Sequence, residues 1–226
     1  IFLCSHTLEH IYCVDTFFEK LDEVSNNEDL FFFQFPSLEY LVIDGRFDQV
    51  HHQHINYFSL YSFSILLARH GFKIVDYQYD RSHYGTLITQ IGKKGGKKSF
   101  VKQDLITEEY IHSRYKLFKD NMTLSNELLN KLDGNFYCYG ASLMLPIINY
   151  YLPNLIECIA IIDSNSKKHN LCYINFDKEI IGEQELQFSE NNLIVTALST
   201  KEATRKILIK LIERKALNVI LPLNII

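Results

Sequence analysis

The stretch LFFFQFP at residues 30–36 is a continuous apolar run that a proline closes. Such a run is typical of a strand that is buried on both faces, as in a parallel sheet. A second apolar run, IFLC, occupies residues 1–4, and apolar residues at helical spacing between Phe17 and Val24 separate the two runs. A strand, a helix and a strand joined by short turns predict a parallel α/β sheet with a right-handed crossover.

The residues that follow this unit predict a long loop, a helix and a hairpin. Residues 37–59 are expected to run as a loop over the sheet edge, and long loops in compact domains are usually functional. Residues 59–69 have the pattern of a helix, which His70 and Gly71 end. Residues 72–79 and 85–91 are expected to pair as an antiparallel hairpin at the end of the sheet.

A change of composition at residues 92–100, which include the basic run KKGGKK, indicates a domain boundary. Beyond it, residues 107–133 predict a long helix that leads into a second α/β unit. The expected strands of that unit lie at 136–141, 155–163, 193–197 and 218–221, and the expected helices at 146–152 and 201–215.

The overall composition argues against several classes of function. The chain has 226 residues, is 47% hydrophobic and carries a net charge of -4, which gives no electrostatic reason to expect nucleic acid as a partner. No apolar run is long enough to span a membrane, and no signal peptide is recognised. The five cysteines form no C-x-x-C pair, which favours reduced thiols in a cytoplasmic protein and argues against structural zinc.

Histidines are concentrated in the segment DGRFDQVHHQHINYFS at residues 44–59, where His51, His52 and His54 surround Gln53. Such a cluster fits a proton-transfer site, because the imidazole pKa lies near neutrality. It also fits a metal site that Asp44 and Asp48 would complete, or a polar loop whose histidines bond to backbone. His52 and His54 would share one face if the segment were extended.

Three motifs of the first half carry a resemblance. His6-Thr7-Leu8-Glu9-His10-Ile11 follows the first strand, the loop at 47–59 reads FDQVHHQHINYFS, and His83-Tyr84-Gly85 lies in the hairpin turn. They resemble the motifs H-x-L-E-H-I, F-D-x-x-Y-x-E-H-x-x-x-F-S and H-G-G of the class I sugar-nucleotide methyltransferases. These enzymes use S-adenosylmethionine and include the C-methyltransferases of deoxysugar pathways.

The second half resembles the C-terminal domain of the same family in its Gly140-Ala141-Ser142 turn and in Asp163-Ser164-Asn165. Small residues between a strand and a helix let backbone amides approach a phosphate, although a tight turn without a ligand is the commoner explanation of such a sequence. The resemblance implies a partial class I methyltransferase (Rossmann-like) sheet with the active-site loop at residues 1–98. A connecting helix at 99–133 and a small α/β domain at 134–226, which helps to hold the sugar nucleotide, would follow.

The resemblance also implies roles for individual residues. His54 would be the general base, with His51, Gln53 and His10 as further catalytic residues, and His6 would lie near the S-adenosylmethionine cofactor. Glu9 is expected to complement a helix dipole. Arg81 is a natural bidentate partner for a diphosphate, and Asp163 resembles a ribose contact. The expected substrate-binding residues are His52, Tyr57, Tyr79, Arg81, His83, Gly85, Gly140, Ala141, Ser142, Asp163 and Asn165.

The departures from the family are at His51 and Gln53, which replace a Tyr and a Glu, and at Leu143 and Met144, which replace residues of the G-A-S-x-K-G turn. Because Gln53 adds no charge beside the base, methylation of oxygen is slightly favoured over methylation of carbon. The first three strands and the Gly-rich cofactor turn are expected upstream of Ile1, so this chain alone is expected to be inactive.

The function predicted from these residues is methyl transfer to a nucleotide-diphosphate sugar in surface polysaccharide or deoxysugar biosynthesis. The alternatives are a non-catalytic sugar-nucleotide-binding module and a metal hydrolase built on the histidine cluster. The oligomeric state is left open, with a homodimer as one option.

Overall fold

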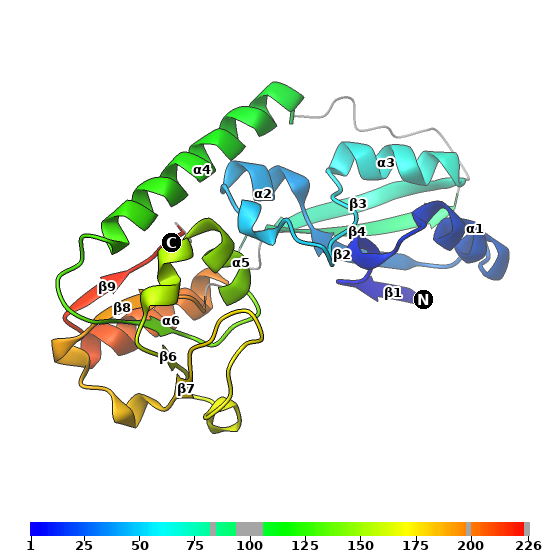
Figure 1. Cartoon of the computed structure of the whole chain (residues 1–226). Coiled ribbons are helices and arrows are strands. Elements are labelled where there is room, and N and C mark those ends of the chain that lie inside the picture. The colour runs from blue at the N-terminus through cyan, green and yellow to red at the C-terminus, as the bar shows by residue number, and fades with distance from the viewer. Residues whose placement is uncertain (82–84, 94–105, 198–199, 224–226) are drawn as a thin grey trace. The chain divides into compact units, whose positions relative to one another are not determined.

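The computed structural model describes residues 1–81, 85–93, 106–197 and 200–223. The chain divides into two compact units, Ile1–Tyr115 and Lys116–Ile226; Figure 1 labels most of their elements. Most of the segment in which a domain boundary was predicted, residues 94–100, lies outside the described residues. No helix in the described ranges combines the length and the apolar character needed to cross a membrane.

The first unit is built on a four-stranded sheet in the order β1-β2-β4-β3. β1 and β2 are parallel, whereas β4 runs antiparallel to both β2 and β3. The predicted strand–helix–strand unit and the predicted hairpin are therefore confirmed. The elements are β1 (Phe2–Ser5), α1 (Val14–Val24), β2 (Phe31–Pro36), α2 (Leu38–Ile43), α3 (Leu60–Arg69), β3 (Phe72–Asp80) and β4 (Thr86–Lys93).

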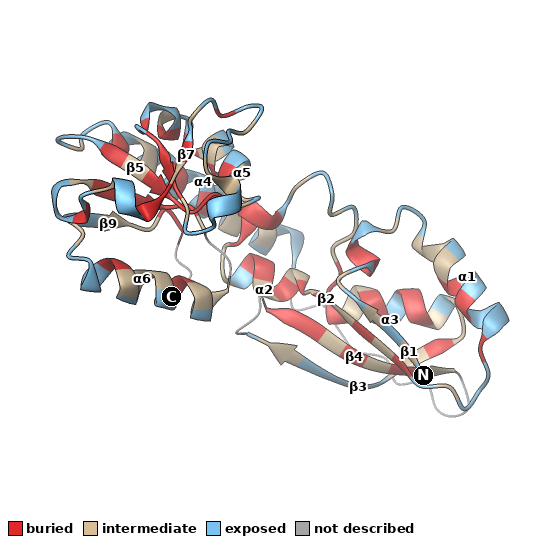
Figure 2. Cartoon of the chain, turned by 90° about the horizontal axis from the view of Figure 1, so that it is seen from below, coloured by how far each residue is buried: buried red, intermediate tan, exposed pale blue. Residues whose placement is uncertain are grey.

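The core of this unit lies on one face of β2. Phe31, Phe33 and Phe35 are almost wholly buried there, with Phe18 of α1 and Phe63 of α3 in the same cluster. Alternate residues of β2 are only half-buried, as the colouring of Figure 2 shows. The prediction that this strand is buried on both faces was wrong, because α1 and α3 both pack on the same face.

The segment at residues 37–59 is not a loop throughout, as was predicted. It begins with α2, whose first turn is capped by the Ser37 side chain accepting a hydrogen bond from the Tyr40 amide. A short 3-10 helix at Phe47–Gln49 follows. The segment ends where Ser59 and Ser62 form a capping box for α3, and Gly71, with a φ of 79°, follows that helix as predicted.

The second unit contains a five-stranded, fully parallel sheet in the order β7-β6-β5-β8-β9. The chain moves outward from β5 to β7 and then returns beside β5 with β8, so the strand order reverses at this point. The arrangement is a mixed α/β one, consistent with a Rossmann-like fold. The elements are α4 (Glu108–Leu129), β5 (Phe136–Tyr139), α5 (Leu145–Tyr151), β6 (Ile161–Ile162), β7 (Ile180–Ile181), β8 (Asn192–Val195), α6 (Lys201–Glu213) and β9 (Asn218–Ile220).

The long strand predicted at residues 155–163 was wrong. A 3-10 helix at Pro153–Glu157 occupies its first part, and β6 contains only two residues. Pro153 favours a helical start, and the Leu155 amide bonds back to the Leu152 carbonyl, so the apolar run turns before it extends. The equally short strand β7 was not predicted.

Candidate functional site

The histidine-rich segment is fastened to the turn that follows β1. The carbonyl oxygen of Glu9 accepts hydrogen bonds from the amides of Ile55 (2.8 Å) and Asn56 (3.1 Å). The Asn56 side chain donates to the carbonyl oxygens of Leu8 (3.2 Å) and Ile11 (2.6 Å). Four hydrogen bonds therefore hold the two predicted motifs, which are far apart in the sequence, side by side.

The turn itself has an uncommon backbone. His6 has a φ of 46°, a left-handed conformation that costs a non-glycine residue about 1 kcal/mol. Its amide bonds to the Gln34 carbonyl of the neighbouring strand at 2.8 Å, and Leu8–His10 forms a 3-10 helix. This path carries Glu9 into the interior, where it is 3% exposed.

Three imidazole rings gather beside Glu9. The ring centroids of His51 and His54 are 4.1 Å apart, and those of His10 and His54 are 4.9 Å apart. The Nδ1 atom of His10 lies 2.7 Å from the carbonyl oxygen of Gln53. The structure thus brings together His10, His51 and His54, three of the four residues expected to be catalytic.

The pairing within the loop differs from an extended arrangement. The His54 amide donates to the His51 carbonyl at 3.0 Å, so residues 51–54 form a tight turn. His51 and His54 consequently face each other, while His52 is exposed. Gln53 is also exposed and contributes its backbone carbonyl rather than its side chain.

Burial sets the protonation of the cluster. It lowers the pKa of His54 to about 4, with a further decrease from the neighbouring His51 and an opposing increase from Glu9. Burial also lowers the pKa of His51. Both rings are therefore neutral at pH 7, and each retains a nitrogen lone pair that can accept a proton or a metal ion.

Tyr57, which was expected to contact substrate, lies at the edge of this cluster. Its hydroxyl accepts a hydrogen bond from the His51 amide at 3.3 Å, and its ring centroid is 6.2 Å from that of His54. Burial raises the pKa of Tyr57, so the phenol remains protonated near neutral pH.

The two aspartates considered as metal ligands have other partners. Asp48 is buried and accepts two hydrogen bonds from Arg46, at 2.8 and 2.7 Å. Asp44 lies 3.6 Å from a guanidinium nitrogen of Arg81. Within the described residues, the set with metal-binding geometry is Glu9, His10 and His54, whose ligand atoms all lie within 4.8 Å of one another.

The residues expected to reach a diphosphate from the hairpin lie around Tyr40. The guanidinium carbon of Arg81 is 5.0 Å from the Tyr40 ring centroid, and the Tyr79 ring is also 5.0 Å from it. Gly85 has a φ of 66°, and a Cβ there would lie 2.1 Å from the Cβ of Tyr40. Gly85 is thus required by close packing, and His83 lies outside the described residues.

Glu39 is a buried carboxylate that the sequence did not single out. It accepts hydrogen bonds from the Ser37 hydroxyl (2.7 Å), the Leu60 amide (2.6 Å) and the Tyr79 hydroxyl (3.1 Å). It therefore ties α2, the start of α3 and β3 together, and its bond to Leu60 holds the C-terminal end of the histidine-rich segment beside α2. Tyr79 is engaged in this bond, and burial, followed by the charge of Glu39, raises its pKa.

In the second unit, the Gly140-Ala141-Ser142 turn is bonded to its own surroundings. The Ala141 amide donates to a carboxylate oxygen of Asp163 at 2.8 Å, and the Ser142 hydroxyl donates to the Thr196 carbonyl at 2.8 Å. Gly140 is needed because a Cβ there would lie 2.1 Å from the Cβ of Ala197. The amide groups expected to meet a phosphate thus include at least one that Asp163 already occupies.

Asp163 itself acts mainly as an internal acceptor. It also receives the Asn165 amide at 2.8 Å and the Lys168 ammonium at 3.1 Å. These bonds join the end of β6 to the turn after β5. These internal hydrogen bonds are a structural reason for the Asp-x-Asn sequence that requires no bound ligand.

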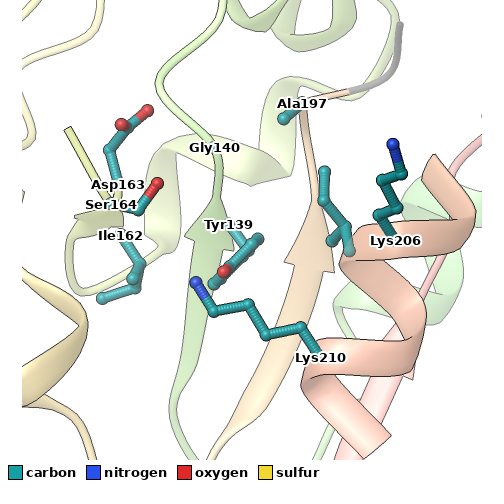
Figure 3. A pocket seen from close by; sticks show the side chains of 9 residues that line it. Tyr139, Gly140, Ile162, Asp163, Ser164, Ala197, Lys206 and Lys210 are labelled. Carbon is teal, nitrogen blue, oxygen red and sulfur yellow. The ribbon is translucent and has the colours of Figure 1, made fainter. Parts of the chain in front are cut away.

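A pocket of about 210 Å³ opens at the carboxyl ends of β5, β6 and β8, where the strand order reverses. Open α/β sheets bind ligands at this position. Lys206, Ile207 and Lys210 of α6 line its other side. Figure 3 shows Lys210 extending from α6 toward Tyr139, and both side chains bond to Glu183.

Comparison with known proteins gives one partial match. A segment of 61 residues is 36% identical to the C-methyltransferase NovU of Streptomyces niveus, and it covers 27% of this chain and 14% of that protein. A scan against protein-family models gives no match. The similarity supports a relationship with methyltransferases and suggests methyl transfer.

Sequence reasoning missed the two buried glutamates and Asn56. Glu9 was expected to complement a helix dipole, but it is buried against the imidazole rings because the left-handed His6 redirects the chain. Its place within the H-x-L-E-H-I motif was the available signal. Nothing local in the sequence marks Glu39, since its three partners come from separate segments.

Proposed function

We propose that this chain carries the acceptor side of a methyltransferase that moves a methyl group from S-adenosylmethionine to a nucleotide-linked sugar. The observation that supports it best is the contact of His54 with His10 and His51 beside the buried carboxylate of Glu9. The partial similarity to a C-methyltransferase agrees with this chemistry.

The donor end of the site would lie at the turn after β1. When bound, S-adenosylmethionine supplies a methyl group on a positively charged sulfur. Glu9 fits such a group, because neither of its carboxylate oxygens accepts a hydrogen bond from the described residues. His6, at the same turn, would contribute mainly backbone contacts.

His54 would act as the general base. As the acceptor attacks the methyl group in a direct displacement, the acceptor–carbon bond forms and the sulfur–carbon bond breaks. The proton of the acceptor passes to the free ring nitrogen of His54, and His10 and His51 hold the ring in place. The pKa of His54, about 4, lies below the neutral range in which a general base is most effective. We therefore favour the less demanding acceptor, a sugar hydroxyl whose proton leaves during the transfer.

The pocket at the carboxyl edge of the second sheet is the proposed contact for the nucleotide part of the substrate. Its size fits a phosphate or a ribose. Lys206 and Lys210 line it, although each is paired with a carboxylate, Glu202 and Glu183 respectively, from which a phosphate would have to draw it. A sugar nucleotide rather than a nucleic acid is the partner that matches one such pocket on a chain of net charge -4.

The test is transfer of a ¹³C-labelled methyl group from S-adenosylmethionine to a panel of nucleoside-diphosphate sugars by the native protein that contains this chain. We expect His54→Ala to reduce the rate by roughly a hundredfold. His112→Ala, which alters an exposed histidine of α4, should not change it. Absence of labelled sugar with the unaltered protein would reject the proposal.

The NMR spectrum of the labelled product distinguishes the acceptor atoms. A new methyl resonance on oxygen supports the preference argued from the low basicity of His54. A methyl group on carbon, as the name of the similar protein would suggest, would overturn that preference but not the proposal of methyl transfer.

A further inference from the structure

The group formed by Glu9, His10 and His54 has the composition of a metal site. One carboxylate and two imidazoles present ligand atoms within 4.8 Å of one another. In a tetrahedral zinc site with bonds of about 2.0 Å, ligand atoms are separated by about 3.3 Å. Small side-chain rotations, without backbone movement, would therefore close the three groups around one ion.

The hydrogen bonding of His10 prepares it as a ligand. Its Nδ1 atom lies 2.7 Å from the Gln53 carbonyl oxygen, which accepts and never donates. Nδ1 must therefore carry the proton, and the lone pair must lie on Nε2. Metal-binding histidines show this arrangement almost always, because a carbonyl or carboxylate behind the ring fixes the tautomer.

The carboxylate of Glu9 provides an independent observation. It is 3% exposed, and neither oxygen accepts a hydrogen bond from the described part of the chain. The Nδ1 atom of His6 lies 3.3 Å from one of its oxygens. A buried charge that lacks hydrogen bonds is costly, and coordination of a cation would offset that cost.

We infer that Glu9, His10 and His54 form a reversible binding site for a divalent transition metal of the zinc class. Two imidazoles and one carboxylate suit Zn²⁺, whereas Mg²⁺ and Ca²⁺ prefer sites built entirely from oxygen. The set leaves the fourth position of a tetrahedral ion open.

The consequence for the site rests on the proposed function. His54 has one lone pair, which either accepts the proton of the acceptor or binds the metal. Zinc bound to Glu9, His10 and His54 would therefore inhibit methyl transfer, and a chelator would restore it. Bound zinc would thus act as a reversible inhibitor at the residues proposed to carry out the methyl transfer.

Zinc binding to this chain can be measured without any activity, by competition with a chromophoric chelator. We expect Glu9→Gln, His10→Ala and His54→Ala each to weaken binding by about tenfold or more. His52→Ala removes a neighbouring but exposed histidine of the same loop, and His112→Ala removes a distant one; both should leave the affinity unchanged. Equal losses for His52→Ala and His54→Ala would overturn the site in favour of unspecific binding by the His-rich loop.

A second measurement uses the unaltered chain and so does not depend on whether the variants fold. Addition of one equivalent of Zn²⁺ to the unaltered chain should shift the imidazole nitrogen resonances of His10 and His54 and leave those of His112 in place. Co²⁺ in the same site should give visible absorption bands of tetrahedral intensity. If neither ring responds at stoichiometric zinc, the metal site is rejected, whatever the outcome of the methyl-transfer assay.

Discussion

The Nδ1 atom of His10 lies 2.7 Å from the backbone carbonyl of Gln53. This bond joins the turn after β1 to the tip of the histidine-rich loop, one residue before His54. It orients the His10 ring and fixes the position of the loop at the same time. The chemistry of the site is thus coupled to the conformation of residues 51–54.

The charge of Glu9 should raise the basicity of His54. Glu9 raises the pKa of His54, against the larger effects of burial and of His51. Glu9→Gln should therefore lower that pKa further, as measured by following the His54 ring proton through an NMR titration. Glu19→Gln, which removes an exposed carboxylate on α1, serves as the control. An unchanged or higher pKa in Glu9→Gln would contradict the assignment.

Stability should rise with pH in the window that His54 controls. The folded pKa is about 4, below the ordinary value of 6.5. Between these two values the unfolded chain binds a proton at His54 that the folded chain does not bind, so acid favours unfolding. Denaturant unfolding of the unaltered chain and of His54→Gln should show a steeper rise from pH 4 to 6.5 in the former. Parallel curves would contradict this expectation.

Loss of the Asn56 side chain should loosen the loop. Asn56→Ala removes the hydrogen bonds to the Leu8 and Ile11 carbonyls, and it should destabilise the first unit by about 1–2 kcal/mol. Hydrogen exchange of the Ile55 amide should accelerate in the same variant. The matched control is Asn27→Ala in an exposed turn; a similar loss there would show that the effect is not specific to the loop.

Two glycines of the first unit provide a matched pair. Gly71 and Gly85 have φ values of 79° and 66°, but only at Gly85 would a Cβ meet another atom, the Cβ of Tyr40 at 2.1 Å. Gly71→Ala should cost about 1 kcal/mol of backbone strain, and Gly85→Ala at least about 2 kcal/mol more. The free energies of unfolding of both variants are measured from the same denaturation transition. Equal losses of stability in the two variants would show that the hairpin turn shifts to accommodate the Cβ at position 85.

The sequence predicted most of the regular elements because their signals are local. The apolar run at Phe31–Pro36 and the capping pattern of Ser59 and Ser62 decide their structures within a few residues. The strand expected at residues 155–163 failed for the opposite reason. A short apolar run does not by itself distinguish a strand from a buried turn, and Pro153 favoured the turn.

The candidate site was predictable only in part. The cluster of His51 and His54 could be anticipated from their spacing, but which two rings face each other depends on the turn between them. The contributions of Glu9 and Glu39 depend on contacts between distant segments. Glu39, for example, bonds to Leu60 and Tyr79, 21 and 40 residues away, and no local pattern records such contacts.

The main chain and the side chain of Glu9 have separate structural roles. Its carbonyl oxygen anchors the loop through Ile55 and Asn56, whereas its carboxylate faces the imidazoles. Replacing the side chain leaves the carbonyl anchor available. Position 9 is therefore a place where natural variation or directed evolution can retune the reactivity of the site, or abolish it, while the loop keeps its shape.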